Sequence, residues 1–198
     1  MSFQSLNKII ESRYLRRENL IVNMQSLETK NINCSSCQGK CCTMMANSMM
    51  MTPIETMDLY KYLKDEGLWT NELIDKLTSC IKDFRLAEQL DLGRGRVFRR
   101  TYTCPFYLNQ FPGCPLPRSV KPYGCLAFNP GQGTPSDGEG CHSELALLEK
   151  REDLVESEED LNQLLKERMN LTWEKLPIPV ALLEMDKVWE QLEDTQLP

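Results

Sequence analysis

The stretch NCSSCQGKCCTMM, residues 33–45, places four cysteines within nine positions. They are Cys34, Cys37, Cys41 and Cys42, and the last two are adjacent. Cys34 and Cys37 have the spacing at which a tight turn lets two thiolates hold one metal, and Cys41 follows closely enough to reach the same centre. Side chains of adjacent residues leave the backbone in different directions, so Cys42 is expected to face a second site or another edge of the same cluster. The stretch therefore predicts a metal-binding loop.

Four further cysteines lie in or next to a long irregular segment, residues 104–140, which contains seven prolines and six glycines. A segment of this composition forms few backbone hydrogen bonds of its own and has little to bury. In a small domain, a metal site is the usual way to order such a segment. The eight cysteines of the two groups are therefore the candidate metal ligands: Cys34, Cys37, Cys41, Cys42, Cys104, Cys114, Cys125 and Cys141.

The bulk composition narrows the class of protein. The chain has 198 residues, is 41% hydrophobic and carries a formal net charge of −6, which suits one domain with helical extensions and argues against a nucleic-acid partner. The polar start of the chain does not resemble a signal peptide, and no run is long and apolar enough to span a membrane. We therefore expect a cytoplasmic protein in a reducing compartment, where cysteines serve metal binding or redox chemistry rather than disulfides. Its partner would be a protein or small-molecule substrate that the sequence does not identify.

Positive charge gathers near the cysteines. Residues 1–138 carry 13 acidic and 17 basic residues, whereas residues 139–198 carry 16 acidic and 6 basic. Arg100, Arg118 and Lys121 are close to the ligands in sequence and can stabilise an anionic cluster or hold a carboxylate or phosphate group. The alternative is that these side chains simply form a solvated face.

Hydrophobic periodicity and capping residues predict a mainly α-helical fold with long irregular metal-binding loops. Thr52, Pro53 and Glu55 together form a helix start with a capping box, and Gly67 should end that helix. The expected elements are helices over residues 4–29, 53–66, 71–90, about 142–152, about 158–170 and about 178–193, with a strand over 97–103. The corresponding division is an N-terminal helix (1–29), a cysteine-cluster metal-binding domain (30–142) and an acidic C-terminal helical extension (143–198).

The cysteine pattern resembles the CxxCxxxCC family, described as a zinc- or iron-chelating domain. The first part of the resemblance is Cys34-x2-Cys37-x3-Cys41-Cys42, and the second follows after a helical insert. The second part consists of Cys104-Pro105-Phe106, Cys114, Lys121-Pro122, Cys125, Phe128, Pro130 and Cys141. The resemblance covers roughly residues 30–142 and implies that the eight cysteines bind metal.

The chain also departs from that family. One extra residue precedes Lys121-Pro122 and another precedes Pro130, while Lys121, Leu126 and Pro117 replace residues that are frequent in relatives. If those positions bind a substrate in relatives, this chain would take a different one. The same domain type occurs in flagellin lysine N-methylases, which implies an enzymatic role for some members.

Two cofactors fit the thiol pattern. Ligands drawn from loops with an adjacent cysteine pair favour an iron–sulfur cluster, [4Fe–4S] in type, over the separated CxxC knuckles of zinc ribbons. Zn²⁺ in a structural or protein-interaction module without catalysis is the alternative, and eight thiols could supply two such sites. In a third arrangement, four thiols bind one centre and the others serve redox exchange or packing. Cys42 and Cys114 would then be the first cysteines excluded as ligands. Whether the chain is an enzyme stays open, and no catalytic residue is assigned.

Overall fold

The computed structural model describes residues 15, 17–22, 25, 39–88, 100–110, 113–130, 141–143 and 152–193. The described part is mostly helical, which confirms the predicted mainly α class. Its longer helices are α2 (Pro53–Asp65), α3 (Asn71–Asp83), α6 (Glu152–Met169) and α7 (Ile178–Glu193), with the single turns η2 (Lys40–Cys42), η3 (Arg118–Val120) and α4 (Tyr123–Leu126). Two antiparallel pairs of short strands complete it: β1 (Met50–Met51) with β4 (Leu176–Pro177), and β2 (Phe128–Pro130) with β3 (Cys141–Ser143).

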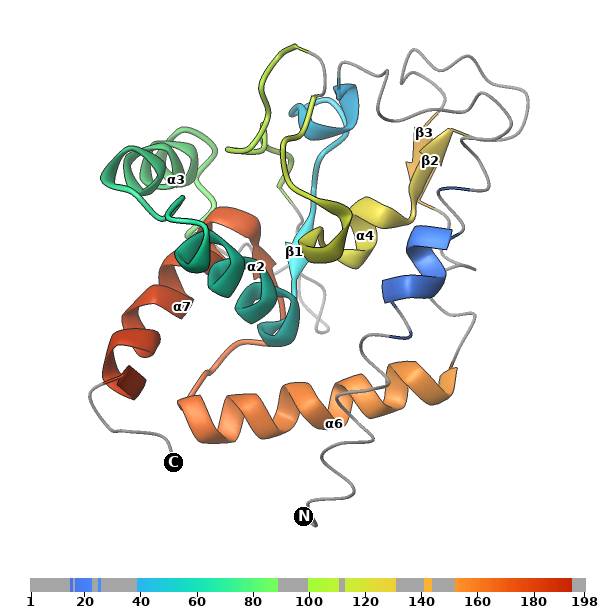
Figure 1. Cartoon of the computed structure of the whole chain (residues 1–198). Coiled ribbons are helices and arrows are strands. Elements are labelled where there is room, and N and C mark those ends of the chain that lie inside the picture. Colours follow the sequence, from blue (N-terminus) through green and yellow to red (C-terminus); the bar gives the residue numbers. More distant parts are fainter. Residues whose placement is uncertain are drawn as a thin grey trace.

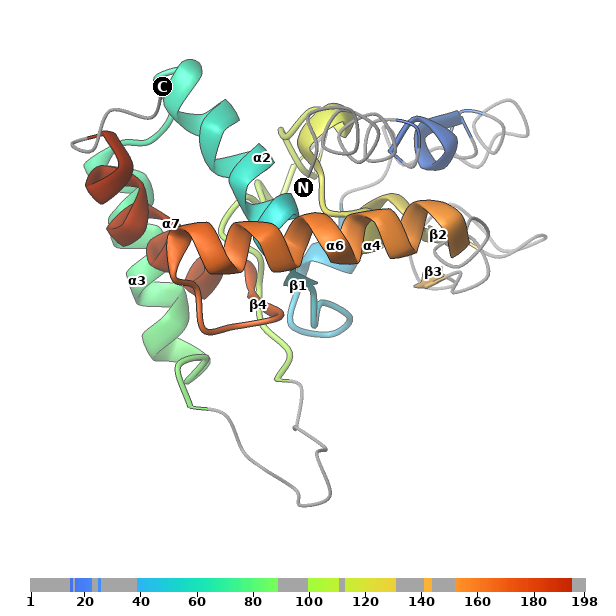
Figure 2. The same ribbon diagram turned by 90° about the horizontal axis from the view of Figure 1, so that it is seen from below.

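Helices α2, α3 and α7 lie together at the left of Figure 1. Helix α2 packs against both α6 and α7, and α7 also packs against α3. Figure 1 shows α6 along the bottom of this view, whereas η2 and the loops beside it lie at the top. Figure 2, seen from below, shows α6 passing across α2 and α7. None of the described helices is both long and apolar enough to cross a membrane.

Helix α2 begins and ends as its sequence predicts. The Thr52 side chain accepts a hydrogen bond from the Glu55 N–H, and the Glu55 carboxylate accepts one from the Thr52 N–H, which completes the capping box. At the other end, Gly67 has a φ of +66° and the Leu68 N–H donates to the Leu63 carbonyl at 2.8 Å. This left-handed Gly and its 6→1 hydrogen bond form a Schellman ending.

Replacing Thr52 with alanine should therefore destabilise the protein by about 1 kcal/mol. The substitution removes the oxygen that accepts from the Glu55 N–H, and Glu55 is itself buried and accepts the Tyr123 N–H at 2.7 Å. The measurement is urea unfolding followed by circular dichroism. Thr52→Ser keeps the cap and should stay near the wild type, so equal losses in the two variants would contradict the capping role.

Helix α3 is shorter than predicted, because it ends at Asp83 rather than near residue 90. Arg85 adopts a left-handed φ of 52°, and the Leu86 N–H donates to the Ile81 carbonyl at 2.9 Å. The chain thus closes with the same motif as α2, but without the glycine that signals it. The early ending of α3 lets Leu86 be buried in the core. Helical periodicity alone does not predict this ending.

The predicted strand over 97–103 is wrong for the part that is described. Residues 100–103 belong to no strand, and residues 97–99 lie outside the described residues. Instead the Tyr102 N–H donates to the Asn47 carbonyl at 2.9 Å, so this segment is tied to the loop that follows η2. The composition of this segment favours a β-strand, but its backbone bonds to a loop instead of to a neighbouring strand.

Three other boundaries differ or fall partly outside the described residues. The helix expected from residue 142 is wrong at its start, because Cys141–Ser143 pairs with β2 as a strand; residues 144–151 are not described. Helix α6 begins at Glu152, before the expected start at 158, so Glu158 lies within the helix and is buried. Helix α7 has the predicted bounds. Of the helix predicted over 4–29, residues 15, 17–22 and 25 are described and helical.

The main hydrophobic core lies between α2, α3 and α7. Tyr60 of α2 is completely buried and its ring lies 4.8 Å from that of Trp69 and 5.4 Å from that of Trp189, centroid to centroid. Tyr102 and Cys104 belong to the same core cluster. The segment that carries the downstream cysteines is therefore packed directly onto the helical core, which fixes its position.

Candidate metal centre

Backbone contacts bring three cysteine-bearing segments together. The Cys42 N–H donates to the Gly39 carbonyl at 2.8 Å and closes η2, and the Cys104 N–H donates to the Cys42 carbonyl at 2.7 Å. Gly39 has a φ of +79°, and a Cβ placed on it would lie 3.0 Å from the Gly113 Cα. The loop of Cys41 and Cys42 thus lies against residue 104 on one side and residue 113 on the other. Glycine at residue 39 permits both the turn and this close approach.

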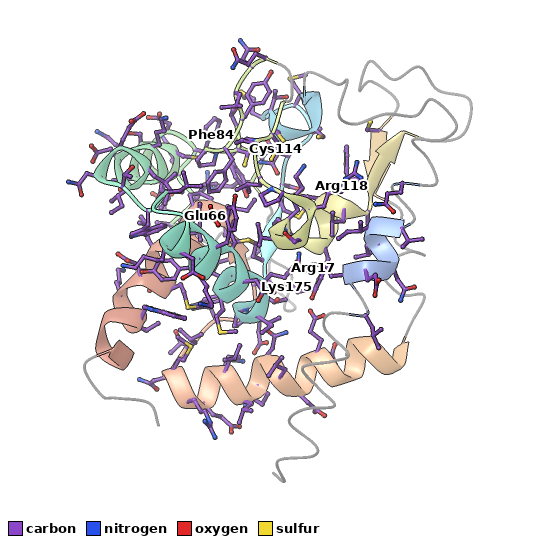
Figure 3. The ribbon with its side chains drawn as sticks, viewed as in Figure 1. Arg17, Glu66, Phe84, Cys114, Arg118 and Lys175 are labelled. Carbon is purple, nitrogen blue, oxygen red and sulfur yellow. The ribbon has the colours of Figure 1, made fainter. Side chains whose placement is uncertain are left out.

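Three thiols form a hydrogen-bonded group within this arrangement. The Sγ atoms of Cys41 and Cys42 are 4.0 Å apart, and Cys42 also shares a hydrogen bond with Cys114. Cys42 therefore lies between a thiol of its own loop and a thiol of the downstream segment. Figure 3 labels Cys114, near the sulfur atoms at this end of the molecule, and Arg118 on the segment that follows.

The three thiols differ in acidity. Hydrogen bonding with Cys42, assisted by the positive charge of Lys121, lowers the pKa of Cys41 and lowers that of Cys114 to about 6. The pKa of Cys42 is raised, chiefly by its hydrogen bond with Cys114, then by the one with Cys41 and by burial. Cys41 and Cys114 are thus the sulfurs with the greater anionic character, which metal binding requires.

Two more thiols complete a group of five. Burial, followed by the effect of nearby thiols, raises the pKa of Cys104 to about 12 and also raises that of Cys125. Cys41 and Cys114 act on both Cys104 and Cys125, and Cys104 also acts on Cys42 and Cys125. Cys80 of α3 acts on Cys104 as well. Buried thiols of this kind lose their protons readily only when a cation replaces them.

The other predicted ligands are placed differently. Cys34 and Cys37 lie outside the described residues. Cys141 lies on β3 opposite Pro130, beside the strand that follows Cys125. Within the described ranges, no group of three or more cysteine, histidine or carboxylate side chains is spaced to hold a single metal ion.

The three predicted basic residues separate in the structure. Lys121 acts electrostatically on Cys41, Cys114 and Cys125 and so belongs to the cysteine group. Arg118 begins η3, three residues before it. Arg100 instead pairs with Glu88 at 3.5 Å.

Residues that support the site were missed by sequence reasoning. Cys80 lies on the apolar stripe of α3 and is buried, and its thiol also donates to the Thr103 carbonyl at 3.4 Å, next to Cys104. The Asn47 side chain donates to the Tyr102 carbonyl at 3.0 Å and ties the same region together. No sequence motif marks these three, because each acts on a segment more than twenty residues away.

Comparisons with protein-family models, with curated proteins and with solved structures found no match to this chain. The interpretation of the site therefore depends on its own residues.

Proposed function

We propose that this chain is an iron–sulfur protein whose cluster is held by cysteines of the 34–42 loop and the 104–141 region. The observation that carries the proposal is the gathering of five thiols from three separate segments around Cys42 and Cys104. Thiols at such a density are unusual as packing alone, because ordinary apolar side chains would fill the same space without bringing ionisable groups together.

The donor set suits the group chemically. Thiolates are the ligands of iron–sulfur clusters, and the Lys121 charge offsets some of the negative charge that deprotonated sulfurs carry. The described candidates for ligands are Cys41, Cys42, Cys104, Cys114 and Cys125, to which Cys34, Cys37 and Cys141 are added by their sequence pattern. A bound cluster would supply electron transfer or, with one open iron, activation of a protein or small-molecule substrate. The resemblance to the CxxCxxxCC family is part of this proposal.

The decisive experiment measures metal and acid-labile sulfide in full-length protein purified without oxygen. We expect about four irons and four sulfides per chain and absorption in the visible region. One or two zinc ions without sulfide or colour would overturn the iron–sulfur proposal and favour a zinc-binding interaction module. A chain free of metal would overturn both.

A pair of cysteine variants makes the assignment specific. Cys125→Ser should lose metal, because it removes a thiol of the five-cysteine group. Cys80→Ser is the control, since Cys80 is assigned no ligand role and a serine hydroxyl can keep its hydrogen bond to the Thr103 carbonyl. Equal metal content in the two variants would show that Cys125 is not a ligand.

A further inference from the structure

Tyr102 links the cysteine segments to the start of α7. Its side chain is completely buried, and its hydroxyl donates to the Met49 carbonyl at 2.6 Å. The same hydroxyl accepts a hydrogen bond of 3.1 Å from the N–H of Ile178, the first residue of α7. One oxygen therefore connects the end of the loop that follows η2 to the N-terminus of a core helix.

The backbone around Tyr102 is tied to the same loop at several points. Its N–H donates to the Asn47 carbonyl at 2.9 Å, and its carbonyl accepts from the Asn47 side chain at 3.0 Å. The Asn47 side chain in turn accepts the Met49 N–H at 3.0 Å. Two residues after Tyr102, the Cys104 N–H donates to the Cys42 carbonyl. Segments 42–49 and 102–104 therefore form one hydrogen-bonded unit that includes two of the candidate ligands.

The position of α7 is set mainly by the helical core, which Cys104 shares. Ile178, Ala181, Leu182 and Met185 are buried in the helical core, and Met50 of β1 pairs with Pro177 just before the helix. A shift of α7 would therefore reach the cysteine unit through the Tyr102 hydroxyl and through β1.

We propose that Tyr102 is a positioning residue through which the docking of α7 regulates how tightly the cysteine site holds its metal. This inference rests on the proposed metal-binding function. Groups that orient metal ligands from outside the first coordination shell typically contribute 10–100-fold to metal affinity. Removing the hydroxyl leaves the buried Ile178 N–H without this acceptor and frees the Met49 carbonyl from the helix.

The chain offers a closely matched control in Tyr60. It is also completely buried in the core, and its hydroxyl also contacts α7, by donating to Asp186 at 2.6 Å. Tyr60→Phe and Tyr102→Phe thus each remove a buried hydroxyl that contacts α7. Only the second removal touches the cysteine unit.

The test loads full-length wild type and both variants with Cd²⁺ and follows release of the metal to excess chelator through the thiolate–cadmium absorption. Tyr102→Phe should release Cd²⁺ about ten-fold faster than the wild type, with Tyr60→Phe indistinguishable from the wild type. Hydrogen exchange of residues 178–182 supplies a second readout. Bound Cd²⁺ should slow their exchange in the wild type and in Tyr60→Phe but not in Tyr102→Phe.

Equal release from the two variants, or equal cadmium effects on exchange, would overturn the inference and leave the metal site standing. A wild type that does not bind Cd²⁺ at all would overturn the inference together with its metal-binding premise. If Tyr102→Phe does not fold, Asn47→Ala loosens Tyr102 from the loop that follows η2, because it removes the side chain that bonds to the Tyr102 carbonyl and the Met49 N–H, and it is judged by the same two readouts.

Discussion

Replacing Arg17 with methionine is expected to lower the free energy of unfolding by about 3–5 kcal/mol, the cost of breaking a buried ion pair from one side. Arg17 lies in the N-terminal helical segment and is 5% exposed. Its guanidinium pairs with Asp58 of α2 at 3.1 Å and also donates to the Lys121 carbonyl. It lies over the Tyr123 ring as well, 4.7 Å from the centroid. One side chain thus joins the N-terminal segment, α2 and the segment between Cys114 and Cys125.

The charges around Arg17 explain why the loss should be large. Glu55, Asp58 and Glu158 all act electrostatically on the Tyr123 hydroxyl, and Arg17 opposes them. Burial chiefly raises the pKa of Tyr123, and the Glu158 carboxylate raises it further. Methionine would leave these carboxylates in a buried site without the guanidinium. Uncompensated buried charge costs far more than a surface ion pair contributes.

Lys61→Met on α2 is the control for this experiment. Lys61 pairs with Asp65 at 3.0 Å, but both side chains are more than half exposed, so the change should fall within about 0.5 kcal/mol. Urea unfolding of both variants gives the comparison. A loss at Arg17 no larger than that at Lys61 would show that the buried pair does not anchor the N-terminal segment.

A double variant separates the pair from its surroundings. Asp58→Leu alone should also destabilise, because it leaves the guanidinium buried without this partner. Arg17→Met combined with Asp58→Leu should cost less than the sum of the two single changes. Strict additivity would indicate that the two side chains do not interact.

The features that sequence predicted well are local ones. Four consecutive residues, Thr52 to Glu55, determine the start of α2, and Gly67 determines its end. Both boundaries can therefore be predicted without knowing any distant contact. The bounds of α7 follow from an apolar pattern of sufficient length. The ending of α3 was missed, because Arg85 adopts there the left-handed conformation that glycine usually signals.

For the candidate site, the sequence predicts which residue types take part but not how they are arranged in space. Cysteine spacing identified the residues, and the structure brings five of them together from segments more than sixty residues apart. The side chains that hold these segments, Arg17, Asn47 and Tyr102, could not be found in this way. Arg17 and the Lys121 carbonyl that it contacts are 104 positions apart, and no periodicity or motif records such a pairing. Residue type and spacing name the candidate ligands, whereas tertiary contacts determine which of the described cysteines meet.

Gly39→Ala is expected to destabilise the protein by about 2–5 kcal/mol and to weaken the proposed metal binding. The φ of +79° alone should cost about 1–2 kcal/mol for any residue with a Cβ. The new methyl group would also lie 3.0 Å from the Gly113 Cα and 3.3 Å from the Tyr107 ring. Because the closest atom is backbone, relief requires the loops to move apart, at a typical overpacking cost of about 1–3 kcal/mol.

Gly67→Ala separates these two contributions. Gly67 has a similar φ of +66°, but a Cβ there would meet nothing within 4 Å, so only the conformational cost of about 1–2 kcal/mol applies. Unfolding free energy and metal content are measured on both variants. Gly67→Ala should keep its metal, whereas Gly39→Ala should lose part of it, because separating residue 39 from residue 113 draws Cys42 away from Cys114. Matching losses of stability with full metal content in both would mean that the close approach at Gly39 is not what holds the two cysteine loops together.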